Sequence, residues 1–186
     1  MKYNFVCLNC NKTIKPNPNI STCPEPNCEG AFEIVYTNTN TKSPQETLVP
    51  LSNILNLTYL GQGNTPIVRL NTLSDNFGIN NIYAKLEYMN PTGSFKDRGS
   101  AMMISALSEF GINEIVEDSS GNAGASISAY SAYSKIKSHI FVPENAPKNK
   151  VSQIQLYGSI VHKIPGQRDN STIAAIKYSE ENSIAY

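Results

Sequence analysis

The sequence predicts an α/β protein with three layers, in which helices cover both faces of a parallel β-sheet, preceded by a small cysteine-rich module. Three observations support this prediction. Strand-like and helix-like segments alternate along most of the chain, glycines follow two of the helix-like segments, and all four cysteines fall within the first 28 residues. With 186 residues, the chain is long enough for one sizeable domain plus a small module.

The composition is typical of a folded protein, because hydrophobic residues make up 40% of the chain and charged residues only 16%. Lys+Arg and Asp+Glu balance at 15 each, so no broad basic surface for nucleic acid is expected. The N-terminus lacks the apolar stretch of a secretory signal, and no run approaches the roughly 18 apolar residues of a membrane span. We therefore expect a cytoplasmic protein with reduced thiols and with no nucleic-acid or membrane partner.

The spacing of the cysteines predicts the nature of the N-terminal module. Cys7 and Cys10 form a C-x2-C pair, Cys23 and Cys28 form a C-x4-C pair, and twelve residues separate the two pairs. This spacing is typical of four thiolates that bind one Zn²⁺ ion, and four free thiols are the alternative. A following strand-like run, "AFEIVY", completes a small zinc-ribbon-like module. Zinc bound by four thiolates has no open position for a substrate, so we expect it to be structural.

The chain divides into a module at residues 1–37, a polar linker at 38–59 that is rich in Asn and Thr, and an α/β domain at 60–186. Gly111 and Gly158 follow two of the predicted helices as C-terminal caps. Four strand–helix units imply a parallel sheet, whose ligands gather where strands run into helix N-termini. The predicted strands are 82–86, 114–117, 139–142 and 159–164, and the predicted helices are 95–110, 123–135, 147–157 and 170–180.

The loop "NPTGSFKDRG", residues 90–99, follows the first of these strands. Gly93 allows a tight turn, Ser94 is a good N-cap, and Lys96 falls in the first turn of a helix. The positive end of a helix disfavours an ammonium group, and a neutral lysine amine can attack an aldehyde. Taken alone, a lysine at this position is more often simply solvated.

The loop "EDSSGNAGAS", residues 117–126, follows the next strand and precedes a helix of small residues. Its backbone N–H groups would point to the same end of the predicted sheet as Lys96 and could hold a carboxylate. The amide of Asn122 can donate a hydrogen bond to an oxygen on a bound ring. A plain N-capping loop explains this motif alone, but two such loops in successive units favour a shared site.

Together with "LGQGNTPIVRL" at residues 60–70, these loops resemble the fold-type II pyridoxal-phosphate enzymes, which have a tryptophan synthase β-like fold. "SFKDRG" is most similar to the threonine synthase family, whereas the dehydratases usually have "SFKIRG" and the cysteine synthases "SVKDR". Gln62 replaces the usual acidic residue of the "GEGNTP" segment in that family. Some family members also carry a zinc ribbon ahead of this domain.

The resemblance implies a role for each loop. Lys96 would bind pyridoxal 5'-phosphate covalently and then move protons, and Asn122 would hydrogen-bond the phenolic oxygen of this cofactor. In the threonine synthase family, the substrate is O-phospho-L-homoserine, which reacts with water to give L-threonine and phosphate. The expected contacts of the substrate carboxylate are Ser119, Ser120, Gly121 and Ala123.

The phosphate of such a cofactor is normally held by a glycine-rich loop at a helix N-terminus. Gly61–Asn64 is followed by an extended run rather than by a helix, so we interpret it as a turn. We therefore expect an incomplete, N-terminal part of the domain, with little activity alone, which forms a homodimer or associates with a missing C-terminal half. The glycines after Lys96 do not cluster: they are Gly99, Gly111, Gly121, Gly124, Gly158 and Gly166.

Two other interpretations stay open. The same scaffold suits a serine/threonine dehydratase or another β-replacement enzyme that acts on a small amino-acid substrate. The third interpretation is a zinc-ribbon protein whose pyridoxal-phosphate fold serves only as a binding module, since half a sheet exposes an edge that invites a partner. Substrate assays separate the first two, and a Lys96→Ala variant separates catalysis from binding.

Overall fold

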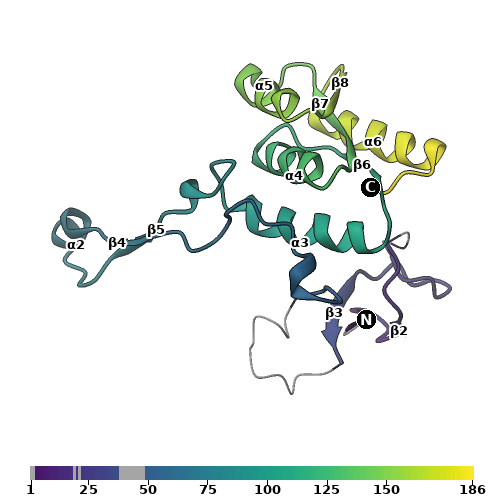
Figure 1. The fold of residues 1–186 in the computed structure, drawn as a ribbon, viewed down its shortest axis with the longest axis horizontal. Helices are drawn as coiled ribbons and strands as arrows, with labels where there is room; N and C mark the ends of the chain where they lie inside the picture. The colour runs from purple at the N-terminus through teal and green to yellow at the C-terminus, as the bar shows by residue number, and fades with distance from the viewer. Residues whose placement is uncertain (1–2, 19, 21, 38–48) are drawn as a thin grey trace.

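The structure is a computed structural model that describes residues 3–18, 20, 22–37 and 49–186. Figure 1 shows a three-layer α/β region, a cysteine-rich module beneath helix α3, and an arm that extends away from the start of α3. No helix in the described part of the chain has the length and apolar character of a membrane span.

The three-layer region is built on a parallel sheet with strand order β6-β7-β8. Helices α4 and α5 cover one face of the sheet, α6 covers the other face, and α3 packs against α4 (Figure 1). The predicted fold class is therefore confirmed, and the four predicted helices differ from the observed ones by at most two residues at either end. The elements are α3 (Lys96–Glu109), β6 (Glu114–Glu117), α4 (Asn122–Tyr133), β7 (Lys137–Pro143), α5 (Lys148–Leu156), β8 (Ile160–Ile164) and α6 (Arg168–Asn182).

Two hydrophobic cores separate these layers, because successive residues of β7 point to opposite faces of the sheet. Ile140 and Val142 belong to the larger core beneath α4 and α5, which also contains the fully buried Tyr130. Phe141 belongs to the smaller core beneath α6, where it packs near Ala175. Both faces of the sheet are thus covered, as a parallel sheet requires.

The predicted strand at residues 82–86 does not join the parallel sheet. It forms β5 (Tyr83–Lys85), which pairs antiparallel with β4 (Ile67–Arg69), and helix α2 (Asn71–Phe77) connects the two strands. The prediction of four parallel units was therefore wrong for the first unit. The apolar pattern of a strand specifies which residues are extended, but it does not specify the partner strand.

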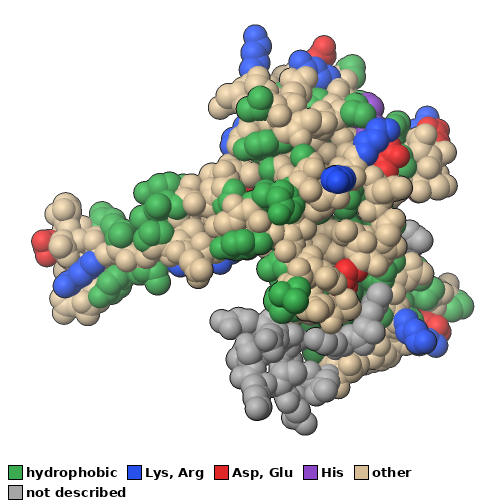
Figure 2. All heavy atoms as spheres, viewed as in Figure 1, with side chains coloured by type: hydrophobic (Ala, Val, Ile, Leu, Met, Phe, Trp, Pro, Cys, Tyr) green, Lys and Arg blue, Asp and Glu red, His purple; other side chains and the backbone are tan. Residues whose placement is uncertain are grey.

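The arm, defined here as residues 66–86, contains β4, α2 and β5. Within it, only Ser74 is buried. Figure 2 shows hydrophobic side chains along much of its visible surface. Such an isolated two-stranded ribbon has little core of its own. The exposed large hydrophobic residues of the arm are Ile67, Val68, Leu73, Phe77, Ile79 and Tyr83.

The N-terminal module is a three-stranded antiparallel sheet with strand order β2-β1-β3. The strand predicted at residues 31–36 is present as β3, whereas β1 and β2 were not predicted. The backbone wraps closely around the cysteines, because a Cβ on Gly30 would lie 2.5 Å from Cys7 Sγ. The strands are β1 (Tyr3–Cys7), β2 (Thr13–Ile14) and β3 (Phe32–Tyr36).

The segment after the module approaches α3. Residues 38–48 of the predicted linker lie outside the described residues, and the remainder includes the short 3-10 helix η1 (Ile54–Asn56). Ser52 Oγ donates to Glu109 Oε1 at 2.7 Å, and the backbone N–H of Thr58 donates to Ser105 Oγ at 2.7 Å. These contacts tie residues 52–58 to α3, while the division of the chain into a module, a linker and a domain stays a prediction.

Candidate functional site

Lys96 is the first residue of α3, where the loop after β5 turns into the helix. Ser94, the predicted N-cap, precedes the cap position, which Phe95 occupies, and Ser94 Oγ accepts a hydrogen bond from the backbone N–H of Lys96 at 3.3 Å. The Lys96 side chain is exposed, and its Nζ lies 4.7 Å from the centroid of the Phe95 ring. The amine is therefore accessible to a ligand that arrives from solvent.

The second predicted loop lies between β6 and α4. Gly121 occupies the N-cap position of α4, and its N–H donates to Ser119 Oγ at 3.3 Å. The first N–H groups of a helix have no partner within the helix, so they can bind an anion. Asn122 is exposed, while its predicted neighbours in the site are half-buried: Ser119, Ser120, Gly121 and Ala123.

The structure brings the two loops together. Ser126, one turn into α4, donates from its Oγ to Asp97 Oδ1 at 2.6 Å, and Asp97 is the residue after Lys96. The starts of α3 and α4 are thus joined by a direct hydrogen bond. The contact does not arise from neighbouring parallel strands, because β5, which precedes the first loop, lies outside the parallel sheet. It arises from the packing of α3 against α4, and the roles of the individual site residues stay a prediction.

Glu117, at the carboxyl end of β6, has an unusual proton affinity that the sequence did not indicate. Burial raises the pKa of Glu117 from its ordinary value of 4.5 to about 7, and the neighbouring Asp118 carboxylate acts in the same direction. The cations of Arg168 and Lys96 oppose this rise in the Glu117 pKa. Lys96 and Glu117 therefore interact electrostatically.

The stability of the protein should fall with rising pH because of Glu117. Between pH 4.5 and about 7, Glu117 stays protonated in the folded state but has lost its proton in the unfolded state. The contribution of Glu117 to the free energy of unfolding is therefore fully present below pH 4.5 and is lost as pH rises through 7. The raised pKa corresponds to a loss of up to about 3 kcal/mol. In urea unfolding, we expect the free energy of unfolding to fall between pH 5 and pH 8, and we expect Glu117→Gln to remove most of this fall.

The control for this prediction is Glu114→Gln on the same strand. Hydrogen bonding to the Lys137 ammonium lowers the pKa of Glu114, so its titration has the opposite sign. This variant should keep the fall in stability between pH 5 and pH 8. An unchanged fall in Glu117→Gln would contradict the assignment.

Gly124 shapes the second loop, although it was not among the predicted site residues. A Cβ at this position would lie 2.0 Å from the carbonyl oxygen of Ser119 and 3.2 Å from Ile154 Cδ1. Only glycine lets the loop backbone pass so close to α4. The signal in the sequence was a second glycine three residues after Gly121.

A polar network joins the base of the arm to α3. Arg98 Nε and Nη2 donate to the two oxygens of Glu87, each at 2.8 Å, and Nη2 also donates to Thr65 Oγ1 at 3.2 Å. Asn90 Nδ2 donates to Glu87 Oε2 at 3.0 Å, and Asn90 Oδ1 accepts from the backbone N–H of Gly63 at 3.0 Å. Hydrogen bonds from Arg98 lower the pKa of Glu87 to about 2. These residues hold the segment before Lys96 in place, which sequence spacing alone did not indicate.

Gln62, which departs from the family pattern, uses both ends of its amide. Its Oε1 accepts from the backbone N–H of Leu60 at 2.9 Å and from the Tyr130 hydroxyl at 3.0 Å. Its Nε2 donates to the carbonyl oxygen of Thr58 at 3.0 Å. An ionised carboxylate has no hydrogen to donate to that carbonyl, so glutamine suits this position.

The four cysteines lie close together in the module, away from Lys96. Their Sγ atoms all lie within 4.8 Å of one another, and both the Cys7–Cys28 and the Cys10–Cys23 pairs are 3.6 Å apart. These distances are too long for disulfides. They suit a tetrahedral zinc site, in which sulfur atoms about 2.3 Å from the metal lie roughly 3.8 Å apart.

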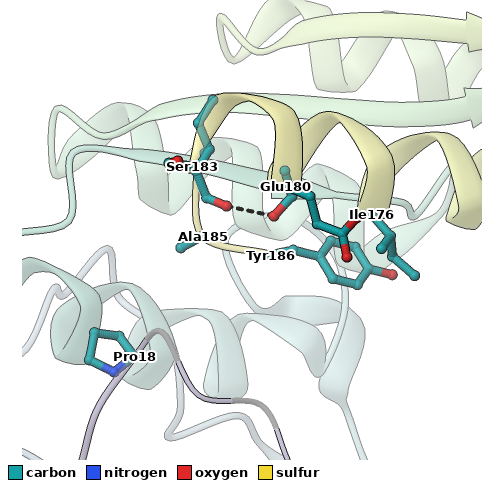
Figure 3. Close-up of a pocket in the computed structure, with 8 residues that line it drawn as sticks. Pro18, Ile176, Glu180, Ser183, Ala185 and Tyr186 are labelled. Carbon is teal, nitrogen blue, oxygen red and sulfur yellow. Dashed lines mark hydrogen bonds between the residues drawn. The ribbon is translucent and has the colours of Figure 1, made fainter.

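A separate hollow, shown in Figure 3, lies between the module and the end of α6. Its volume is about 470 Å³. It is lined by Pro18, Ile176, Ser179, Glu180, Ser183, Ile184, Ala185 and Tyr186. None of the residues predicted for catalysis or substrate binding lines this hollow.

In a comparison with known protein families, residues 58–186 match the family described as "Pyridoxal-phosphate dependent enzyme". The threonine synthase of Methanocaldococcus jannaschii is 32% identical over 96% of this chain and 47% of its own length. The chain thus spans about half the length of this relative.

Two solved structures extend the comparison to other reactions. Serine racemase from Dictyostelium discoideum is 32% identical, with a TM-score of 0.57 over 64% of this chain and 39% of that one. Threonine deaminase isoform 2 from Solanum lycopersicum is 26% identical, with a TM-score of 0.61 over 66% of this chain and 34% of that one. These similarities support the fold, and they leave several reactions open.

Proposed function

Because the chain belongs to the pyridoxal-phosphate dependent enzyme family, we propose that it takes part in a reaction of the threonine synthase type. The proposed reaction is that of a carbon–oxygen lyase, in which O-phospho-L-homoserine and water give L-threonine and phosphate. The observation that carries this proposal is the hydrogen bond between Ser126 and Asp97, which joins the Lys96 loop to the Asn122 loop. Similarity to the M. jannaschii threonine synthase over nearly the whole chain supports the choice of reaction.

The residues present fit pyridoxal 5'-phosphate and an amino-acid substrate. Lys96 would hold the cofactor through Nζ, and its accessible amine could then accept and donate protons at the substrate carbons. Asn122 would donate to the phenolic oxygen of the cofactor. When bound, the cofactor supplies an electron sink for bonds broken next to the amino group.

The start of α4 would hold the substrate carboxylate. Its free N–H groups carry the positive end of the helix dipole, and serine hydroxyls flank them. The close passage of the loop at Gly124 keeps these groups in a fixed arrangement. The residues proposed for this contact are Ser119, Ser120, Gly121 and Ala123.

The position of the reactive lysine can be tested by chemical trapping. The chain is mixed with pyridoxal 5'-phosphate and reduced with sodium borohydride, and the modified lysines are located by mass spectrometry. Lys96 should carry most of the label, and Lys96→Ala should lose that label. Lys177→Ala on α6, which removes a lysine paired with Glu181, is the control and should keep the label on Lys96. An even distribution of label over the exposed lysines would contradict the proposal.

The substrate is tested in a chimera, because the chain spans only part of its relatives. Residues 1–186 replace the matching part of the M. jannaschii threonine synthase, and release of phosphate from O-phospho-L-homoserine is measured. We expect Lys96→Ala to lower this rate about a thousandfold or more. Formation of a 2-oxo acid from threonine or serine, without phosphate release, would favour the dehydratase alternative that the threonine deaminase similarity suggests. A chimera whose activity does not depend on Lys96 would favour a non-catalytic binding module.

We propose that Cys7, Cys10, Cys23 and Cys28 bind one structural Zn²⁺ ion. The donor set supports this, because four sulfur atoms within 4.8 Å of one another match the ligands that tetrahedral zinc prefers. Four protein ligands would leave no position for substrate, so zinc would support the fold rather than the reaction.

We also propose that the arm is covered by another polypeptide in the active assembly. The exposed hydrophobic side chains of the arm and its lack of a core support this proposal. The part of the relatives that this chain does not span is the proposed occupant, and a second copy of the chain is the alternative. The chimera tests the choice, because it supplies that part and should protect the arm from hydrogen exchange. The proposed site of action is the cytoplasm.

A further inference from the structure

Asp97 is an unusual polar residue beside Lys96, because its side chain is fully buried although the Lys96 side chain is exposed. Its carboxylate accepts three hydrogen bonds. Thr92 donates from its backbone N–H at 2.7 Å and from its hydroxyl at 2.5 Å, and Ser126 donates from its Oγ at 2.6 Å. The structure describes no ion pair for this carboxylate within residues 49–186.

These three bonds link separate parts of the site. Thr92 lies in the loop before Lys96, and its carbonyl oxygen accepts a hydrogen bond from Gln153 Nε2 of α5 at 3.3 Å. Ser126 lies on α4, one turn after Asn122. One carboxylate thus connects the Lys96 loop with the helix that carries the proposed carboxylate-binding loop.

The geometry also determines where Lys96 points. Consecutive residues of a helix differ by about 100° around its axis, so the direction of one side chain sets the direction of the next. With Asp97 held towards α4, Lys96 is turned outwards, in agreement with its exposure. Charge-assisted hydrogen bonds of this length are strong and directional, which suits a residue that orients a neighbour.

We propose that Asp97 is a positioning residue, which through Ser126 fixes the amine of Lys96 relative to the start of α4. This inference rests on the proposed function, since it assumes that Lys96 is the reactive lysine. Asp97 itself does not contact the reacting atoms. As an acid in the first turn of α3, Asp97 also complements the helix dipole.

The test compares two buried serines on α4. Ser126→Ala removes the link to Asp97, whereas Ser128→Ala removes a hydroxyl that donates only to the carbonyl oxygen of Gly124 in its own helix, at 2.6 Å. Both variants should raise the unfolding equilibrium constant, Ser128→Ala by about tenfold and Ser126→Ala by about tenfold or more, because hydrogen bonds to charged groups contribute more to stability. If Asp97 had a purely structural role, both variants would lose stability without changing which lysine reacts.

The informative measurement is the trapping of pyridoxal 5'-phosphate by borohydride, expressed as the ratio of label on Lys96 to label on Lys177. Ser126→Ala should lower this ratio about tenfold or more, because small misplacements of a reacting group have large effects on rate. Ser128→Ala should leave the ratio unchanged. Asp97→Asn keeps the shape of the side chain and most of its hydrogen bonds. Its labelling ratio should therefore stay closer to that of the unmodified chain than the ratio of Asp97→Ala.

The outcomes separate this inference from the proposed function. If the unmodified chain shows no preference for Lys96, the proposed function fails. If Lys96 is preferred but folded Ser126→Ala keeps the full ratio, or if Ser128→Ala lowers it equally, only the positioning role of Asp97 is overturned. Should Asp97→Ala not fold, the two serine variants still decide.

Discussion

Removal of zinc from the cysteine cluster is expected to unfold the N-terminal module, while the three-layer region stays folded. Among the described residues of the module, only Tyr3, Cys7, Cys23 and Gly30 are buried. Two of these four are proposed ligands, so the metal site takes the place of a hydrophobic core. A module of this size depends on its metal for folding.

The measurement is hydrogen exchange with and without a chelator in reducing buffer. Amides of β1 and β3 should lose protection on chelation, whereas those of β7 should keep it. Cys23→Ser should lower zinc affinity by several orders of magnitude, and Thr13→Ser on β2 serves as the matched control. Purified chain that contains no zinc, with a module that is nevertheless protected, would refute the proposed metal site.

Gly124→Ala is expected to distort the start of α4 and to destabilise the protein. The added Cβ would lie 2.0 Å from a backbone oxygen, which cannot rotate away as a side chain can. Overpacking typically costs about 1–3 kcal/mol or more, whereas alanine gains about 1 kcal/mol over glycine in helix propensity. The clash is therefore the larger effect. We expect the free energy of unfolding, measured with urea, to fall by about 2 kcal/mol or more. Labelling of Lys96 by pyridoxal 5'-phosphate should fall as well, because the loop at Ser119 must move.

Gly99→Ala is the matched control for this variant. Gly99 also lies in a helix, but no atom lies within 4 Å of its Cβ position. Alanine should therefore leave the free energy of unfolding unchanged or raise it by up to about 1 kcal/mol. If the two variants behave alike, the close approach at Gly124 does not limit stability.

The helices of the domain could be predicted closely from the sequence because their signals are local. The turn at Gly93, the small residues of α4 and the glycine after α3 each act within a few positions. The clustering of the cysteines was likewise expected, because short spacings place sulfur atoms on neighbouring turns. The meeting of the two loops was expected from the topology of a parallel sheet. Because β5 lies outside that sheet, the contact depends instead on the packing of α3 against α4.

Contacts between distant residues could not be predicted in the same way. The strand at residues 82–86 was recognised as extended, but its antiparallel pairing with β4 depends on the competition between possible partners. Asp97 lies in the predicted first turn of a helix, whereas its hydrogen-bond partner on α4 lies 29 residues away. A residue that hydrogen-bonds across such a separation looks, in the sequence, like any other polar residue.

The network at the base of the arm has a mechanical consequence. Thr65 and Glu87 flank the arm on either side, and both hydrogen-bond to Arg98, two residues after Lys96. The base of the arm is therefore anchored to the first turn of α3. A polypeptide that binds the far end of the arm would restrict the movement of Lys96 without contacting it.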